Sequence, residues 1–399
     1  MKKTILLYIL IFILFFVFIL FSQRNNNDND KTLITFWTLQ LGTFDKYINN
    51  IISEYEKENQ SVKIKWVDVP YSEGEKRTLA AILSDNPPDL INLTPDFSAL
   101  LAQKKALYTI NKEKLNQFLP SILESLKYQN EYFGIPFYAT SAVTLYNKDL
   151  TNKKISTYDE LFSILPKKNS YLTMFSFTEN DTLLKLLNKY GINSYENINT
   201  DKSIYLFSQF KRMYDENIIP KECVTQTHRD ALEKYMSGQL SYLVTGANFI
   251  NMIKENAPSI YNSTGVIPQL VGDTNLYDFS LMNFVIPKKS KNPDSALDFA
   301  IYFTNKANQL ELAKMTTVLP VNKDALNDNY FKFSKSTNIQ DIARILSAKQ
   351  LYNIQPSILN TNKKKDLNTL SANYIQEILI NNKNIKYSLD KFSEDWQKL

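Results

Sequence analysis

The sequence contains one cysteine and one histidine among its 399 residues, Cys223 and His228. A disulfide needs two thiols and a structural zinc site needs about four Cys or His ligands, so neither can form within this chain. Catalysis that uses histidine as acid or base would have to use His228. Because His228 stands just before a predicted helical segment, Ala231 to Met236, we expect a solvated or capping residue there. We therefore expect no metal site and no cofactor.

Glycine is also scarce. With eight glycines the chain has no GxGxxG or GxxxxGK loop, which excludes the common phosphate-binding loops and argues against a nucleotide-binding enzyme. The net charge of +5 comes from scattered lysines rather than one dense cluster, which argues against nucleic acid as a partner. Catalysis by paired carboxylates stays open, because 41 Asp and Glu offer many pairs and a sequence does not show which of them meet.

The first thirty residues predict an export or anchoring segment. Lys2 and Lys3 precede the segment 4–21, whose hydrophobic run extends from Ile5 to Phe21, and a polar stretch follows at residues 25–30. The run is long for a signal peptide, whose apolar region spans about 7 to 15 residues, and marginal for a spanning helix, which needs about 17 to 25. No small residues precede a cut at Ser22. We therefore favour an uncleaved N-terminal hydrophobic helix over a cleaved signal peptide, with the remainder of the chain outside the cytoplasmic membrane.

From Lys31 onward strand and helix patterns alternate. Residues 32–37, 62–67 and 89–93 are predicted strands, and the two segments between them have apolar residues at helical spacing. Strands separated by single helices favour an α/β fold with a mostly parallel, doubly wound sheet. Ligands of such sheets bind beyond the carboxyl ends of the strands. That rule selects the residues that follow each of the three strands.

The stretch from Tyr132 to Leu150 is predicted to lead from one folding unit into another. Gly134 and Pro136 favour extended, non-helical backbone around them, and residues 142–146 have the composition of a short strand. We expect residues 137–140, which carry two aromatic rings and a hydroxyl, to form an irregular connection. Such connections often hold binding groups, although an ordinary packed loop is the alternative.

An ordered set of segments resembles the extracellular solute-binding proteins of ABC importers, sugar-binding type (family 1, maltose-binding-protein-like). The segments are ITFWT, NPPDLINLTPD, YFGIPFYATSAVTLYNKDL, YMSGQLSYLVTGANF, VIPKKSKNPDSALDFAIYFTNKANQLELAK and VLPVNKDAL. The resemblance implies a two-lobed periplasmic-binding-protein-like fold (type II), in which each lobe is a sheet flanked by helices and a cleft lies between the lobes. Lobe 1 would comprise residues 31–137 and about 275–315, and lobe 2 about 138–274 and 316–399.

The resemblance also implies a sugar site built from aromatic rings and hydrogen-bonding groups. The candidate ligand-binding residues are Trp37, Thr38, Gln40, Tyr71, Asn92, Thr94, Asp96, Tyr138, Thr140, Asn248, Phe249 and Asn283. This chain departs from the family in two places: Asn248 stands near the usual position of a tryptophan, and no glycine pair precedes the VIP strand. Asp96 has an alternative interpretation as a helix cap, and the alternation around Trp66 predicts a core residue.

These observations predict a monomeric binding protein without catalytic activity, located outside the cytoplasmic membrane. It would capture a carbohydrate, an oligosaccharide or glycoside, and deliver it to the membrane permease of an ABC transporter. Residues 4–21 would attach it to the membrane. Two alternatives stay open: a membrane-tethered sensor with an empty or degenerate site, and a polysaccharide-acting enzyme that uses two carboxylates.

Overall fold

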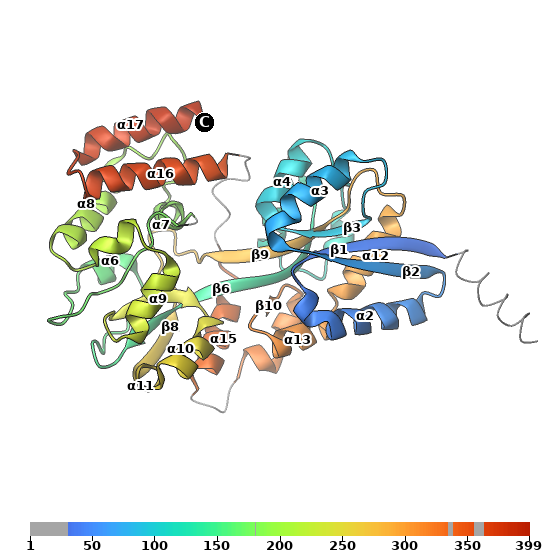
Figure 1. Cartoon of the computed structure of the whole chain (residues 1–399), viewed down its shortest axis with the longest axis horizontal. Helices are drawn as coiled ribbons and strands as arrows, with labels where there is room; N and C mark the ends of the chain where they lie inside the picture. Colours follow the sequence, from blue (N-terminus) through green and yellow to red (C-terminus); the bar gives the residue numbers. More distant parts are fainter. Residues whose placement is uncertain (1–30, 180, 334–337, 355–362) are drawn as a thin grey trace, which may run out of the picture. The chain divides into compact units, whose positions relative to one another are not determined.

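The computed structural model describes residues 31–179, 181–333, 338–354 and 363–399 (Figure 1). The chain forms two compact units. Among the described residues, the first holds 31–92, Ala106–Tyr108 and Val285–Phe303, and the second holds those within Leu93–Lys105, Thr109–Phe284 and Thr304–Leu399. The predicted anchor at residues 4–21 lies outside the described residues. In the part of the chain that is described, no helix combines the length and the hydrophobicity of a membrane span.

The first unit contains a parallel three-stranded arrangement, as the alternating pattern predicts. Strand β1 (Thr32–Leu39) pairs with β2 (Val62–Val69) on one side and with β3 (Leu90–Leu93) on the other. The aromatic core joins β1 to α12 (Pro293–Phe303): the ring centroids of Phe36 and Phe299 are 5.4 Å apart. Helix α2 (Asp45–Glu58) buries its apolar face against the same core, as its three- and four-residue spacing indicates.

The second unit is organised around β6 (Ile135–Asn147), which pairs antiparallel with β7 (Tyr242–Gly246), β8 (Thr264–Pro268), β9 (Phe279–Val285) and β10 (Leu319–Pro320). The expectation of an irregular connection at residues 137–140 is therefore wrong, because these residues are part of β6. At Pro136, which by sequence favours non-helical backbone, the pairing of β6 with β9 shifts register between Pro136 and Tyr138. Proline has no N–H for the ladder, so the irregularity is local and the strand continues.

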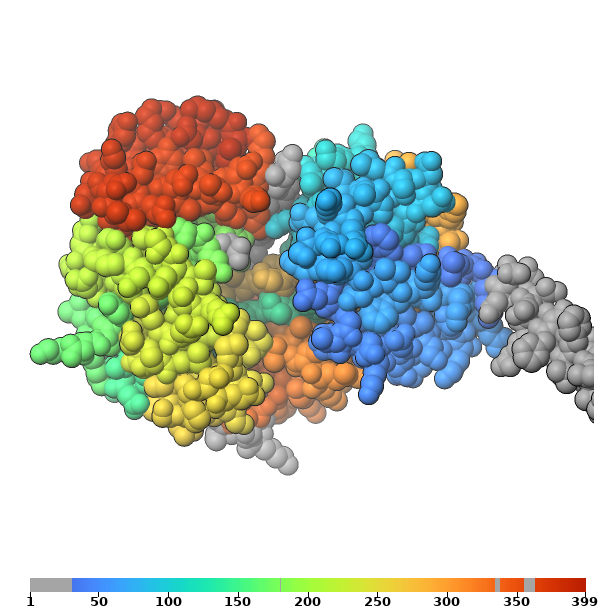
Figure 2. All heavy atoms as spheres, in the orientation of Figure 1, coloured from blue at the N-terminus to red at the C-terminus, as the bar shows by residue number. Residues whose placement is uncertain are grey.

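The remaining helices, 3-10 turns and short strands complete both units. They are η1 (Gly42–Phe44), η2 (Tyr71–Glu73), α3 (Gly74–Leu83), α4 (Pro95–Gln103), η3 (Lys112–Leu115), α5 (Pro120–Leu123), η4 (Glu124–Leu126), β4 (Lys127–Tyr128), β5 (Glu131–Tyr132), α6 (Tyr158–Phe162), α7 (Thr182–Lys189), α8 (Asp201–Asp215), η5 (Lys221–Val224), α9 (His228–Met236), α10 (Phe249–Asn256), α11 (Pro258–Ser263), α13 (Lys306–Met315), α14 (Lys323–Leu326), η6 (Asn329–Phe331), α15 (Ile339–Gln350), α16 (Lys364–Leu379) and α17 (Ile385–Lys398). Helices α16 and α17, red in Figure 2, cover one end of the second unit beside α8.

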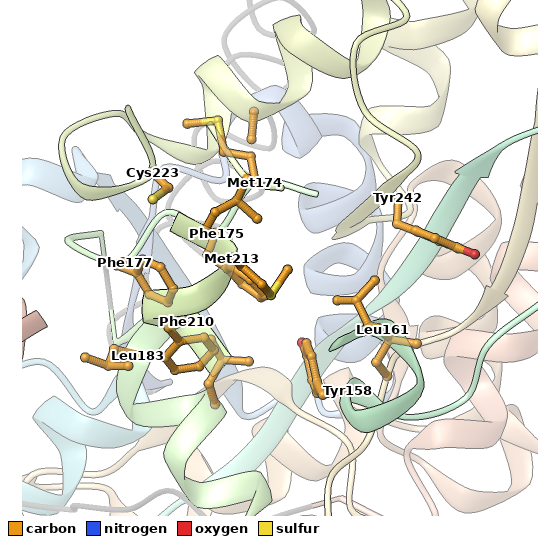
Figure 3. Packing of buried hydrophobic residues seen from close by; sticks show 14 of the residues in the cluster. Tyr158, Leu161, Met174, Phe175, Phe177, Leu183, Phe210, Met213, Cys223 and Tyr242 are labelled. Atoms are coloured by element: carbon orange, nitrogen blue, oxygen red, sulfur yellow. The ribbon is translucent and has the colours of Figure 1, made fainter. Parts of the chain in front are cut away.

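The core of the second unit is rich in aromatic rings. Phe175 and Phe177 are stacked with their centroids 5.1 Å apart, and Phe210 of α8 lies 5.0 Å from Phe177 (Figure 3). Cys223 is buried beside this cluster, and burial raises the pKa of its thiol to about 12. A thiol that stays protonated is a weak nucleophile, so Cys223 is a packing residue.

Candidate functional site

The second unit contains a pocket of about 720 Å³. Four predicted ligand-binding residues line it: Tyr138 and Thr140 from β6, and Asn248 and Phe249 at the start of α10. Tyr158 and Tyr242 also border the pocket, but both are buried in the core behind it. The pocket therefore combines aromatic faces with hydroxyl and amide groups. Ligands that carry both apolar and hydrogen-bonding surfaces bind in sites of this composition.

The link between β7 and α10 depends on a glycine. A β-carbon added to Gly246 would lie 2.4 Å from Oδ1 of Asn248, so only glycine leaves room for the amide in this position. Asn248 is the residue before α10, but its side chain accepts no capping hydrogen bond. Among the described residues, the Asn248 amide thus lines the pocket without serving as a helix cap.

His228 also lines the pocket, which corrects the expectation of a solvated or capping residue. The cap of α9 is Thr227, and the His228 ring packs edge-on against Phe249 with centroids 5.5 Å apart. Its Nε2 lies 2.9 Å from the hydroxyl of Thr245. Its backbone N–H donates to the carboxylate of Glu179. Burial lowers the pKa of His228, and the nearby Glu179 charge acts in the opposite direction.

Five candidate residues belong to the first unit. Trp37 is half-buried in β1, Gln40 follows that strand with φ 54°, and Tyr71 is 56% exposed. The other two, Thr38 and Asn92, are fully buried in β1 and β3. All five thus lie near or just after the carboxyl end of a strand, and burial separates Thr38 and Asn92 from the other three.

The hydroxyl of Thr38 is engaged within the protein. It donates to Asp68 at 2.7 Å and accepts from the indole N–H of Trp66 at 2.8 Å. Asp68 also accepts from the backbone N–H groups of Leu41 and Gly42, and so fixes the loop after β1. The alternation around Trp66 predicted a core residue. Trp66 is half-buried, and its indole N–H is held by this hydrogen bond, so the prediction holds only for part of the side chain. Asp68 was missed by the sequence analysis.

Three candidates surround α4. Thr94 precedes the helix and Asp96 lies in its first turn, so the interpretation of Asp96 as the cap is wrong. The Asp96 carboxylate pairs with Lys364 at 2.7 Å, and Lys364 also lies 3.0 Å from Asp181. Burial acts to lower the pKa of Lys364, but the two carboxylates outweigh it and raise that pKa. Asn283 is buried and donates to the hydroxyl of Ser98 at 3.0 Å, so it is not among the pocket-lining residues.

Comparison with known proteins identifies the chain. The family described as bacterial extracellular solute-binding protein matches residues 50–338. The chain belongs to this family. A maltotriose-binding protein of Pyrococcus abyssi is 24% identical over 277 residues, 65% of this chain and 60% of the relative. The alignment therefore spans less than two thirds of that relative.

Solved structures agree with the family. A candidate oligosaccharide periplasmic-binding protein from Synechococcus sp. MITs9220 matches with a TM-score of 0.79 and 26% identity, covering 92% of this solute-binding protein and 98% of that chain. The extracellular solute-binding protein from Staphylococcus aureus in complex with maltose matches with a TM-score of 0.76 and 18% identity, covering 92% and 97%. The predicted two-lobed periplasmic-binding-protein-like α/β fold is thereby confirmed.

The sequence analysis of this solute-binding protein missed three charged residues that line the pocket, Glu179, Lys185 and Asp278. Glu179 stands in a polar loop segment that follows an apolar run, and binding residues are often carried on such loops. Lys185 lies on α7 and is paired with Asp181 at 3.0 Å. Asp278 is a single acidic residue between aromatic neighbours, and nothing in its local sequence indicates the pocket.

Proposed function

We propose that this protein is the substrate-binding component of an ABC transporter and captures an oligosaccharide or glycoside outside the cytoplasmic membrane. Family membership supports the binding role. The names of the relatives support the ligand class, because they refer to maltotriose, to maltose and to oligosaccharides. The observation that carries the proposal is the pocket of the second unit, where rings and polar groups share one surface.

The physical argument follows from the shape of a sugar. A pyranose ring has apolar C–H faces and a rim of hydroxyls, so its site needs both flat apolar surfaces and hydrogen-bond partners. The partly exposed rings of Tyr138 and Phe249 offer the first, and Asn248 and Glu179 offer the second. Each buried hydroxyl left without a partner would cost about 1 to 3 kcal/mol, so the polar groups are as necessary as the rings.

The candidate residues are proposed to contribute in two ways. Tyr138, Thr140, Asn248 and Phe249 would contact the sugar in the pocket, and Trp37, Gln40, Tyr71, Thr94 and Asp96 are proposed as further ligand contacts. Thr38, Asn92 and Asn283 are buried, and we propose that they act by holding the backbone around the site.

We further propose that the protein is a monomer attached to the outer face of the cytoplasmic membrane by residues 4–21. It would deliver its sugar to a membrane permease and leave the ligand chemically unchanged. The names of its relatives, which are binding proteins, support the absence of catalysis.

A thermal-shift screen of the full chain in mild detergent tests this function. The panel contains maltotriose, galacto-oligosaccharides, amino acids, peptides and polyols. We expect at least one oligosaccharide to raise the melting temperature, since a ligand at 100 times its Kd stabilises the folded state by about 2.7 kcal/mol. Stabilisation by an amino acid or peptide alone would contradict the ligand class. Conversion of the sugar, analysed after incubation, would favour an enzyme.

Point variants then test the pocket. Phe249→Ala and Asn248→Ala should each weaken binding of the identified sugar about tenfold or more, because a lost ring contact is worth about 0.5 to 1.5 kcal/mol beyond its buried area. Tyr387→Ala is the matched control: Tyr387 is an exposed aromatic residue of α17 and does not line the pocket. Equal affinity in Phe249→Ala and Tyr387→Ala would exclude this pocket as the sugar site.

A further inference from the structure

A buried lysine lies directly behind one of the pocket's carboxylates. The Lys189 side chain, at the end of α7, is 1% exposed, and its Nζ lies 3.0 Å from Oδ2 of Asp278. Nζ also donates to Oε1 of Gln269 at 2.8 Å and to the carbonyl of Leu276 at 3.4 Å. These three partners match the three N–H groups of an ammonium. Asp278 is 17% exposed and lines the pocket, whereas the Lys189 side chain is not among the pocket-lining residues.

The backbone of Asp278 is held by a closed ring of hydrogen bonds. Its N–H donates to Oε1 of Gln269 at 2.7 Å, and the Gln269 N–H donates to Oε1 of Gln350 at 2.7 Å. The amide of Gln350 donates to the Ser141 hydroxyl at 2.8 Å, and that hydroxyl donates to the Asp278 carbonyl at 3.1 Å. Gln350 belongs to α15 and Ser141 to β6. The position of Asp278 is therefore fixed from several elements at once.

Stability alone does not account for this ion pair. Two charges lose their hydration on burial, and replacing a buried pair with apolar side chains of similar volume is often neutral or stabilising. Burial lowers the pKa of Lys189, and the Asp278 charge acts against that effect. The Lys189–Asp278 ion pair therefore has a desolvation cost, and Asp278 lines the pocket. We look for the role of this ion pair in ligand binding.

We propose that Asp278 is a specificity-determining residue that accepts hydrogen bonds from hydroxyls of an uncharged carbohydrate, and that Lys189 is the positioning residue that holds its carboxylate in place. This proposal rests on the proposed function and adds the residue that distinguishes hydroxyl-bearing from deoxy ligands. A carboxylate has two oxygens and about four acceptor positions, so the contact of Oδ2 with Lys189 does not by itself exhaust its capacity to accept from hydroxyls. It would also disfavour ligands that carry a carboxylate or phosphate at this position.

The first test removes both charges while nearly preserving shape. Lys189→Met/Asp278→Asn should fold with a melting temperature close to that of the wild type, and its affinity for the sugar found by the thermal-shift screen should fall at least tenfold. The control is Lys211→Met/Asp215→Asn, which neutralises the 2.5 Å ion pair of α8 away from the pocket. This control should bind as the wild type does.

Monodeoxy analogues of the same sugar separate ligand contact from general damage. In the wild type, one analogue should bind at least tenfold more weakly than the parent sugar. In the double variant the difference between that analogue and the parent should shrink, because a neutral amide oxygen replaces the charged acceptor and hydrogen bonds to neutral groups are weaker. If the double variant does not fold, Asp278→Glu takes its place. This variant keeps the charge but moves the oxygens by one methylene, and it should change the order in which the analogues bind.

The outcomes separate the two proposals. If the wild type binds the sugar and the variants keep both its affinity and its ranking of analogues, the role of Asp278 is overturned while the binding function stands. If the wild type binds no sugar, the proposed function fails and this inference fails with it.

Discussion

Tyr146 on β6 and Gly265 on β8 are register partners, and the Tyr146 ring occupies the space that a side chain at position 265 would need. A β-carbon added there would lie 2.1 Å from Cζ of Tyr146. Tyr146 is itself buried in the core of the second unit. The pairing of β6 with β8 therefore requires glycine at position 265. Strand β6 also carries pocket-lining residues between positions 138 and 142.

Gly265→Ala should destabilise the protein by about 1 to 3 kcal/mol, the usual cost of forcing an extra group into a packed interior. Denaturant unfolding followed by circular dichroism measures this change. Gly191→Ala is the control, because no atom lies within 4 Å of its added β-carbon and only its φ of 75° opposes alanine, at about 1 kcal/mol. A smaller loss at Gly265 than at Gly191 would show that the ring moves aside freely.

Stability should depend on pH through His228. Its pKa in the folded protein is below the ordinary 6.5 because of burial, with Glu179 as the opposing charge. At a pH between those two pKa values the unfolded chain binds more protons than the folded protein, so the free energy of unfolding rises with pH. The contribution of His228 to this free energy is lost progressively as the pH falls below about 6.5. His228→Gln should flatten the profile between about pH 5 and pH 7.5. Parallel profiles for the wild type and the variant would contradict the buried imidazole.

The pocket should discriminate against acidic sugars. Glu179 lines it, and the other pocket-lining charges are in ion pairs, Asp278 with Lys189 and Lys185 with Asp181. At about 0.15 M salt we expect an oligosaccharide that contains a uronic acid to bind at least tenfold more weakly than a neutral one of equal length, because like charges repel in a partly desolvated site. Glu179→Gln should narrow the difference in calorimetric titrations. Glu196→Gln, an exposed change away from the pocket, should not.

Gln309 of α13 should be important for folding. Its buried amide donates to the Phe137 carbonyl at 2.6 Å and accepts from the Val321 N–H at 2.9 Å. Gln309→Leu would leave both backbone groups unpaired, at about 1 to 3 kcal/mol each. Glu311→Leu, an exposed change in the same helix, should cost far less in chemical denaturation. Equal effects would mean that water or a rearranged backbone satisfies both groups.

Local patterns predicted the elements of the first unit well, for a physical reason. The alternation in β2 and the three- and four-residue spacing in α2 each record one buried face, and a buried face is visible within a short window. Strand β6 was different. Its first half pairs with β9, far away in the sequence, and that pairing continues the strand through residues 137–140, where an irregular connection was predicted. Backbone pairing between distant segments leaves little trace in either one.

The candidate site also contains residues that local sequence indicated and residues that it did not. Tyr138, Thr140, Asn248 and Phe249 were found through the order of family-like segments, and the structure brings all four to one pocket. The ion pair of Lys189 and Asp278 was not predictable, because neither residue has a local pattern that refers to the other. The direction of the His228 ring was also hidden, since helical spacing alone does not show that Thr245 and Phe249 lie beside it.

The single histidine allows one direct measurement of the central claim, that a sugar binds in the pocket of the second unit. With labelled histidine, the imidazole gives one NMR signal from the full chain, and His228 lines the pocket. Titration with the sugar identified by thermal shift should move this signal in a saturable way, with the same Kd as calorimetry gives. Calorimetric binding of that sugar with an unchanged His228 signal would contradict the account.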